Sequence, residues 1–289
     1  MTPGRRGMLL MVLFVAIWAA VEALAGRVLR VYSPYQVVFT RYAVHLALML
    51  AVWGFRDPGS LWRTRRPAYQ LSRSLLMLCM PASWVMAAQA GVDPGTASSI
   101  FWLSPLFILG FGRLVLGERA PLALWIAAAA AVAGAFAVCG FHRVPPAWLV
   151  VFPLAMAGSF SLYVAMTRSL RTETTRANLF YTALGVALAL SVAMPRLWVW
   201  PSARDLSAMV AIGVIGFGAL WALDALAAAA PVSITAPLAP LQLGFTIGLD
   251  VGLRRELPGL RVMAALALIG VAAAYAFVRE PRLAVGQAA

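Results

Sequence analysis

The chain has 289 residues, of which 63% are hydrophobic and 11% are charged, and its mean hydropathy is +0.87. A soluble domain of this length cannot bury so much apolar surface, so a soluble globular protein is excluded. The formal net charge of +13 comes from Arg without any Lys. Because no soluble basic segment exists, a nucleic-acid partner is not expected, and we expect these Arg side chains to contact membrane lipid at the loops.

Runs of about 20 apolar residues, enough to cross a hydrocarbon core of roughly 30 Å, follow one another with short connections. They predict an all-α membrane protein with ten transmembrane helices and short loops. The first run continues well past the length of a signal-peptide core, so we expect a permanent span there. The predicted spans are Gly7–Leu29, Pro34–Gly54, Tyr69–Gly91, Pro94–Leu116, Pro121–Gly140, Pro146–Ser169, Arg176–Pro195, Asp205–Ala228, Val232–Leu253 and Gly259–Val278.

Two stretches of the sequence resemble one another. Ala97–Glu118 and Val232–Glu256 share a Ser and a Pro at a constant offset of 135 residues, and this spacing indicates an internal duplication. We therefore expect one membrane domain made of two five-helix repeats, residues 1–143 and 144–289. Because five spans are an odd number, the second copy enters from the opposite face, and such inverted repeats typically enclose a central cavity near the bilayer midplane.

The distribution of Arg orients the first half of the chain. Its loops on the side of the N-terminus carry most of the Arg residues, whereas those on the other side carry few. Loops rich in Arg normally lie in the cytoplasm, so the N-terminus, and with an even number of spans the C-terminus, are predicted to be cytoplasmic. The second half shows almost no bias.

Several features together resemble the EamA-type transporters of the drug/metabolite transporter (DMT) superfamily. They are the duplication itself, the prolines of the fourth and ninth spans, the Gly117-Glu118 and Arg255-Glu256 pairs that end these spans, and the small residues around Gly134 and Gly270. The length and the abundant Trp are most similar to the YddG-type amino acid exporters. This resemblance implies a multi-pass protein of the bacterial inner (plasma) membrane that exports neutral and aromatic amino acids by alternating access.

Polar and aromatic residues fall on single faces of the predicted helices, because positions three, four and seven residues apart align on a helix. These faces are candidates for the wall of a substrate cavity. The alternative for the aromatic members is that they face lipid or only pack. The candidates are Trp18, Glu22, Arg41, Trp84, Gln89, Ser98, Trp102, Tyr163, Trp221, Asp224, Ser233 and Gln242.

Ionisable groups inside spans are costly unless they are paired or solvated. Glu22 and Arg41 both lie about seven residues from the predicted outer ends of their spans, which places both at a depth of roughly 10 Å. This geometry allows an ion pair between them that joins two adjacent helices; the alternative is that either group meets the zwitterionic head of a substrate. Gln89 and Asp224 share the 135-residue offset and are expected near the outer and inner mouths, where each could gate, cap a helix or contact substrate.

Proline and glycine mark possible helix breaks. Pro105, Pro237 and Pro240 each remove a backbone donor and free a carbonyl one turn earlier, so they predict a kink or a substrate-binding break. Gly244 and Gly248 have the spacing of a GxxxG motif, which favours close helix packing or, alternatively, a sliding surface.

Several chemistries have no sequence support. There is no GxxxxGK[ST] or HExxH motif, and the chain has only two His. We therefore expect no catalytic residue, no metal site, no cofactor and no enzyme activity. The predicted function is amino acid export, with a multidrug or nucleotide-sugar carrier or a non-transporting membrane protein as alternatives. The expected partners are amino acids and membrane lipid, and the choice between monomer and homo-oligomer stays open.

Overall fold

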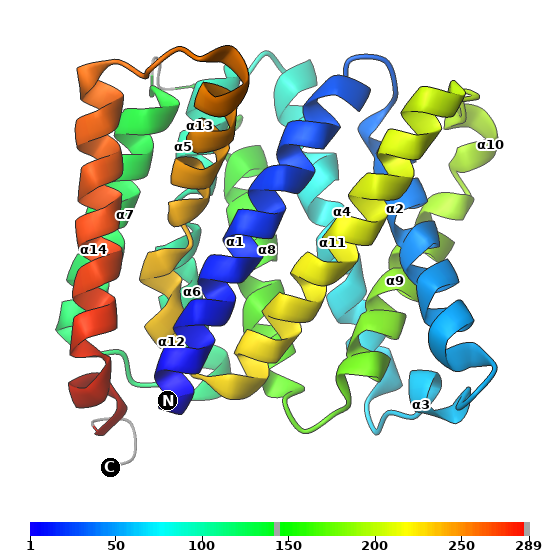
Figure 1. Cartoon of the computed structure of the whole chain (residues 1–289), viewed down its shortest axis with the longest axis horizontal. Coiled ribbons are helices and arrows are strands. Elements are labelled where there is room, and N and C mark those ends of the chain that lie inside the picture. The colour runs from blue at the N-terminus through cyan, green and yellow to red at the C-terminus, as the bar shows by residue number, and fades with distance from the viewer. Residues whose placement is uncertain (142–144, 286–289) are drawn as a thin grey trace.

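A computed structural model describes residues 1–141 and 145–285, with the side chains of residues 254 and 281–285 outside the description. The described part of the chain is helical and contains no strand (Figure 1). Its elements are α1 (Pro3–Val28), α2 (Pro34–Met49), η1 (Leu50–Gly54), α3 (Gly59–Trp62), α4 (Pro67–Gln89), α5 (Pro94–Phe101), α6 (Ser104–Leu116), α7 (Leu122–Cys139), α8 (Val151–Ser169), α9 (Thr175–Ser191), α10 (Met194–Leu197), α11 (Ala203–Ala229), α12 (Val232–Thr235), η2 (Ala236–Leu238), α13 (Leu241–Arg254) and α14 (Leu260–Val285).

Eight helical segments within the described residues are long and apolar enough to cross a membrane. They are Pro3–Val28, Pro34–Gly54, Pro67–Gln89, Pro94–Leu116, Leu122–Cys139, Ala203–Ala229, Val232–Leu253 and Leu260–Glu280. The predicted sixth and seventh spans form α8 and α9, which have 19 and 17 residues and are not among these eight. The chain is thus a multi-pass membrane protein, and ten crossings stay a prediction.

Local sequence explains where several helices begin and end. Pro34 opens α2 and Pro94 opens α5, in the first turn, where a missing backbone N–H costs nothing. The Asp93 carboxylate caps α5 by accepting a hydrogen bond from the backbone N–H of Thr96 at 2.9 Å. Gly117 ends α6 and Gly140 ends α7, both with positive φ, which glycine adopts without steric strain.

The fourth and ninth spans are broken near their middles, as the prolines predict. Trp102 and Leu103 separate α5 from α6, and Pro105 is the second residue of α6. In the ninth span, Pro237 lies in the 3₁₀ segment η2 and Pro240 directly precedes α13. Short-range backbone hydrogen bonds bridge both breaks, from the Leu103 N–H to the Ile100 carbonyl at 3.0 Å and from the Ala239 N–H to the Ala236 carbonyl at 3.1 Å.

The two halves make corresponding contacts. Helix α1 packs on α11 and α13, and α4 and α6, from the same half, pack on α8 of the second half. Likewise α4 contacts α9 while α11 contacts α2, and α7 contacts α14. Exchanging each span with the span five places along the chain converts these contacts into one another.

Corresponding elements also run in opposite directions. We call the end of the bundle that holds the N-terminus the lower end, as drawn in Figure 1, and the other the upper end. The fourth span begins with α5 at the upper end and finishes with α6 below, whereas the ninth begins with α12 at the lower end and finishes with α13 above. Helix α4 leads up from α3, and its counterpart α11 leads down to α12 (Figure 1).

Candidate transport site

A cavity of about 470 Å³ lies between the helices of both halves. Its walls come from α1, α2, α4, α5 and α13, with single contributions from α7, α8 and α11. It reaches the upper end of the bundle, because Leu29 and Pro34, which flank the connection between α1 and α2, belong to its lining. This volume is typical of sites for small molecules.

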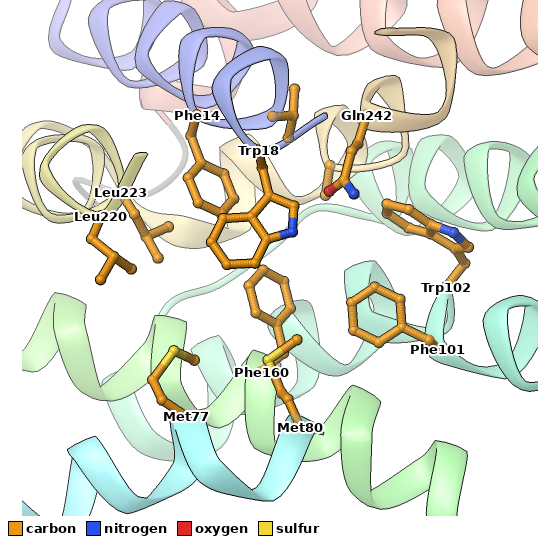
Figure 2. Close-up of a pocket in the computed structure, with 12 residues that line it drawn as sticks. Phe14, Trp18, Met77, Met80, Phe101, Trp102, Phe160, Leu220, Leu223 and Gln242 are labelled. Carbon is orange, nitrogen blue, oxygen red and sulfur yellow. The ribbon is translucent and has the colours of Figure 1, made fainter. Parts of the chain in front are cut away.

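Aromatic side chains close the cavity towards the lower end. Figure 2 shows a much smaller pocket of about 30 Å³ that shares Trp18, Phe101 and Trp102 with the cavity. Phe160 forms its centre, with its ring 5.8 Å from that of Phe101 and 6.5 Å from that of Phe14. The space left between these rings is about the size of one water molecule.

The cavity wall carries one carboxylate and one guanidinium. Glu22 is exposed to the cavity and lies beside the side chains of Gln242 and Trp18. The guanidinium carbon of Arg41 lies 5.2 Å from the ring centroid of Trp18 and 4.8 Å from that of Tyr42. Among the ion pairs of the described residues none joins Glu22 to Arg41, so this pair is not formed, and the buried Nε of Arg41 has no hydrogen-bond partner.

The structure brings together part of the predicted cavity wall. Residues from five spans meet there, as the single-face argument predicts. Those that line the cavity are Trp18, Glu22, Arg41, Trp84, Ser98, Trp102 and Gln242. Cys139, Thr246, Met80 and Phe101 also line it. The sequence analysis did not select these, because a Cys, a Met or a single Thr in an apolar helix gives no signal of its own.

Other predicted wall residues lie elsewhere. Trp221 is 47% exposed on the outer surface of α11, and Gln89 is exposed at the end of α4. Asp224, only three residues after Trp221, is buried. The prediction placed Trp221 and Asp224 on one inward face, but α11 is packed so that the Asp224 side turns to the bundle and the Trp221 side away from it.

Tyr163 and Asp224 belong instead to a buried polar network around Arg73, below the cavity. Arg73 donates hydrogen bonds to Thr167 Oγ1 at 2.8 Å and to the Asn178 carbonyl at 2.7 Å. Asn178 in turn donates to Asp224 Oδ1 at 2.8 Å. The Arg73 guanidinium also lies 5.0 Å from the ring centroid of Tyr163.

The sequence analysis missed Arg73, which it counted only among the Arg residues that orient the first half of the chain. It is buried within α4, and it also donates to Gln70, which donates to Asn178. The available signal was Gln70 three residues before Arg73, which places two polar groups on one helical face. A buried charge held by several hydrogen bonds between helices of the two halves fixes their relative position.

Ser233 does not reach the cavity either. It lies fully buried at the start of α12, and its backbone N–H donates to Glu118 Oε2 at 3.0 Å. The neighbouring Val232 N–H donates to Glu118 Oε1 at 3.3 Å. The predicted Ser of the ninth span therefore marks a helix start and not the cavity wall.

The GxxxG prediction for α13 is not supported by the packing. A Cβ added to Gly244 or Gly248 would meet no other atom within 4 Å, so neither glycine lies at a close helix contact. The close approach occurs between α7 and α14, where a Cβ on Gly134 would lie 2.7 Å from Ile269 Cγ1 and 2.9 Å from the Ala265 carbonyl oxygen.

The described residues contain no group of three His, Cys, Asp or Glu side chains that could hold a metal ion. The two cysteines, Cys79 and Cys139, are not disulfide-bonded.

Comparison with known proteins agrees with this architecture. A crystal structure of a protein superposes with a TM-score of 0.82 at 22% identity, and the match covers 96% of this chain and 98% of that chain. This likeness shows a shared fold. Among curated proteins no sequence matches the chain. Residues 5–140 match the EamA-like transporter family, so this stretch is an EamA-like transporter domain of the DMT superfamily, within a multi-pass membrane protein.

Proposed function

We propose that this protein is an amino acid carrier of the YddG type that works by alternating access. The observation that carries the proposal is the cavity open towards the upper end and closed below, with Glu22 and Arg41 in its wall and no ion pair between them. A zwitterion supplies one partner for each of these charges. An unpaired charge inside a membrane protein is energetically costly, so the binding of a zwitterion would lower this cost for Glu22 and for Arg41 at the same time.

The assignment of substrate atoms follows from chemistry. The buried Nε of Arg41 is an unused donor, suited to a substrate carboxylate. Glu22 with Gln242 offers acceptors to an ammonium group. Trp84 and Trp102 provide apolar surface for a bulky side chain, which favours aromatic and other neutral amino acids.

Alternating access of this kind uses two equivalent halves of the protein. We propose that these halves are two inverted repeats, residues 1–143 and 144–289. The corresponding contacts between halves and the opposite directions of the fourth and ninth spans support them. In such a repeat, rocking of one bundle against the other moves the opening from one end to the other around a fixed site.

The resemblance further suggests the bacterial inner membrane, export as the direction, and cytoplasmic termini. On that orientation the cavity faces the outside in this structure. Labelling of Arg30→Cys and of Arg63→Cys, in the upper and lower connections, with a reagent that does not cross membranes tests this orientation. Each is introduced together with Cys79→Ala and Cys139→Ala, because Cys139 lines the cavity. We expect only the thiol introduced by Arg30→Cys to react in intact cells.

The main competitors are other DMT-type substrates. A nucleotide sugar needs several cations for its phosphates, and among the described lining residues Arg41 is the single cation. An organic cation would suit Glu22 and the aromatic wall, since ammonium groups bind to aromatic faces. Competition between Phe and a hydrophobic cation therefore separates the amino acid carrier from a multidrug carrier.

The decisive experiment is flux in vesicles that contain only this protein. We expect saturable uptake of radiolabelled Phe, Met or Thr, with competition by neutral amino acids and none by nucleotide sugars. Absence of amino acid flux from correctly folded protein would overturn the proposal. Flux of the cation alone would assign the multidrug alternative, and flux of no substrate would favour a non-transporting protein.

A further inference from the structure

Two charged side chains hold the connection between α11 and α12 at the lower end of the bundle. Glu118 follows α6, and Arg168 lies in the last turn of α8. Their closest atoms, Arg168 Nε and Glu118 Oε1, are 3.6 Å apart, and their side chains are only 15% and 11% exposed. Figure 1 places α6 and α12 side by side at this end.

Both side chains bind the main chain of this connection. Arg168 Nη1 donates to the carbonyl oxygens of Ala227 at 2.6 Å and Ala228 at 3.0 Å, which end α11. Glu118 accepts from the N–H groups of Val232 and Ser233, which begin α12. These are the free backbone groups of two helix ends, and the pair satisfies both kinds with the matching charge.

The sequence of the connection makes it dependent on this pair. Residues 227–230 are all Ala, and Pro231, at the N-cap of α12, makes no side-chain capping hydrogen bond. The connection therefore contains no side chain of its own that could form a hydrogen bond, although Ala230 is buried and packs on Gly7 of α1. We name Glu118 and Arg168 together the clasp.

The clasp lies where the lower end must open. Leu220 and Leu223 of α11 line the small pocket beneath the cavity, and the clasped residues follow within the next two turns. Glu118 belongs to the first half, whereas α11 and α12 belong to the second. Movement of this connection away from Glu118 would uncover the Leu223 side of the pocket.

At the upper end, the contacts of the described residues differ from those of the clasp. There the fourth span is capped by its own Asp93, and the counterpart of Glu118 is Glu256, which is exposed. Glu256 follows Arg255 with φ 58° just as Glu118 follows Gly117 with φ 69°, so the local geometry is the same while the contact differs. The cavity is open at the upper end and closed at the clasped end.

We propose that Glu118 and Arg168 act as a main-chain clasp that keeps the lower end closed and sets the resting state of the carrier. The clasp rests on the proposed alternating access, and its release is the step that opens the lower end. The clasp holds the connection through hydrogen bonds to the free backbone carbonyls of α11 and the free backbone N–H groups of α12. An ion pair between the two side chains without these hydrogen bonds would not keep the lower end closed.

The test measures opening without measuring transport. Leu223→Cys is introduced with Cys79→Ala and Cys139→Ala, and the rate of reaction with a bulky thiol reagent is followed in purified protein. We expect Glu118→Gln to raise this rate about tenfold, because a hydrogen bond to a charged group shifts an equilibrium by about that factor or more. Glu173→Gln is the matched control, since Glu173 accepts only an exposed hydrogen bond from the Arg65 N–H at the same end.

Charge reversal separates a main-chain clasp from a plain ion pair. Glu118→Arg with Arg168→Glu restores opposite charges, but Arg cannot accept from Val232 and Ser233, and Glu cannot donate to Ala227. We expect the double variant to react as fast as Glu118→Gln. A rate restored to that of the parent, or no increase in Glu118→Gln, overturns the proposal.

Native Cys139, which lines the cavity, provides a second reporter if the Leu223→Cys background folds poorly. In the otherwise unchanged chain its reaction rate must not rise in Glu118→Gln, because opening below closes the upper end; a rise overturns the clasp. These results do not depend on flux, so a protein that transports no amino acid can still have the clasp, and a carrier can lack it.

Discussion

The guanidinium of Arg41 stacks on Trp18, with its central carbon 5.2 Å from the ring centroid, and none of the ion pairs of the described residues involves Glu22. Both charged groups thus stay available in the cavity wall while aromatic faces stabilise the cation. The charges of Glu22 and Arg41 therefore do not neutralise one another, as they would in an ion pair between adjacent helices. The first two predictions concern each charge in turn.

Arg41→Met should remove recognition of the substrate carboxylate. We expect the KM for Phe to rise about tenfold or more, because a hydrogen bond to a charged group is lost. Transport of phenethylamine, which lacks the carboxylate, should change little. The measurement is vesicle uptake of both compounds, and an equal loss for both would contradict the assignment.

Glu22→Gln should have the complementary effect. Gln keeps the shape and one acceptor but loses the charge that pairs with an ammonium group. We expect weaker uptake of Phe with about a tenfold higher KM, and improved competition by 3-phenylpropionate, which has the carboxylate alone. If Arg41→Met and Glu22→Gln both weaken the binding of the same analogue, phenethylamine or 3-phenylpropionate, the two charges do not bind opposite ends of the substrate.

Trp102→Ala should change substrate preference. The side chain lines both the cavity and the pocket below it, and aromatic pairs contribute about 0.5–1.5 kcal/mol beyond simple burial. We expect uptake of Phe to fall relative to Thr. Trp221→Ala is the control, because that ring is 47% exposed and lies outside the cavity, and it should leave the Phe to Thr ratio unchanged.

Gly134→Ala should destabilise the protein where α7 meets α14. The added Cβ would lie 2.9 Å from a backbone oxygen, so the helices must separate, at a cost of about 1–3 kcal/mol. Thermal unfolding in detergent should show a lower Tm. Gly244→Ala has open space and should keep or slightly raise the Tm, since Ala favours a helix; a lower Tm there would indicate that α13 packs more closely than described.

The sequence predicted the positions of the helices and the breaks in two of them. The length of an apolar run indicates where a helix begins and ends, and a proline removes a backbone donor at any position in a helix. Helix positions and helix breaks can therefore be predicted without knowing the tertiary structure. Pro105 and Pro240 lie at breaks for this local reason. The lengths of α8 and α9 leave their crossing of the membrane to be tested.

The rotation of each helix about its own axis could not be predicted as well. Glu22 and Trp102 face the cavity, but Trp221 turns outward, because the orientation of α11 is decided by its packing against α1 and α2. In lipid an apolar helix has two acceptable environments, so an aromatic residue does not reveal which side is inward. Arg73 and Glu118 were missed as network members because their partners lie on distant spans.

The small pocket beneath the cavity has room for about one water molecule, and below it the buried side chains of Met8, Met11 and Ile108 belong to the packed core of the bundle. The closed part of the bundle therefore extends along about four turns of α1, from Trp18 down to Pro3. If the protein works by alternating access as proposed, rotations of a few side chains are insufficient to open the lower end, and whole helices must move.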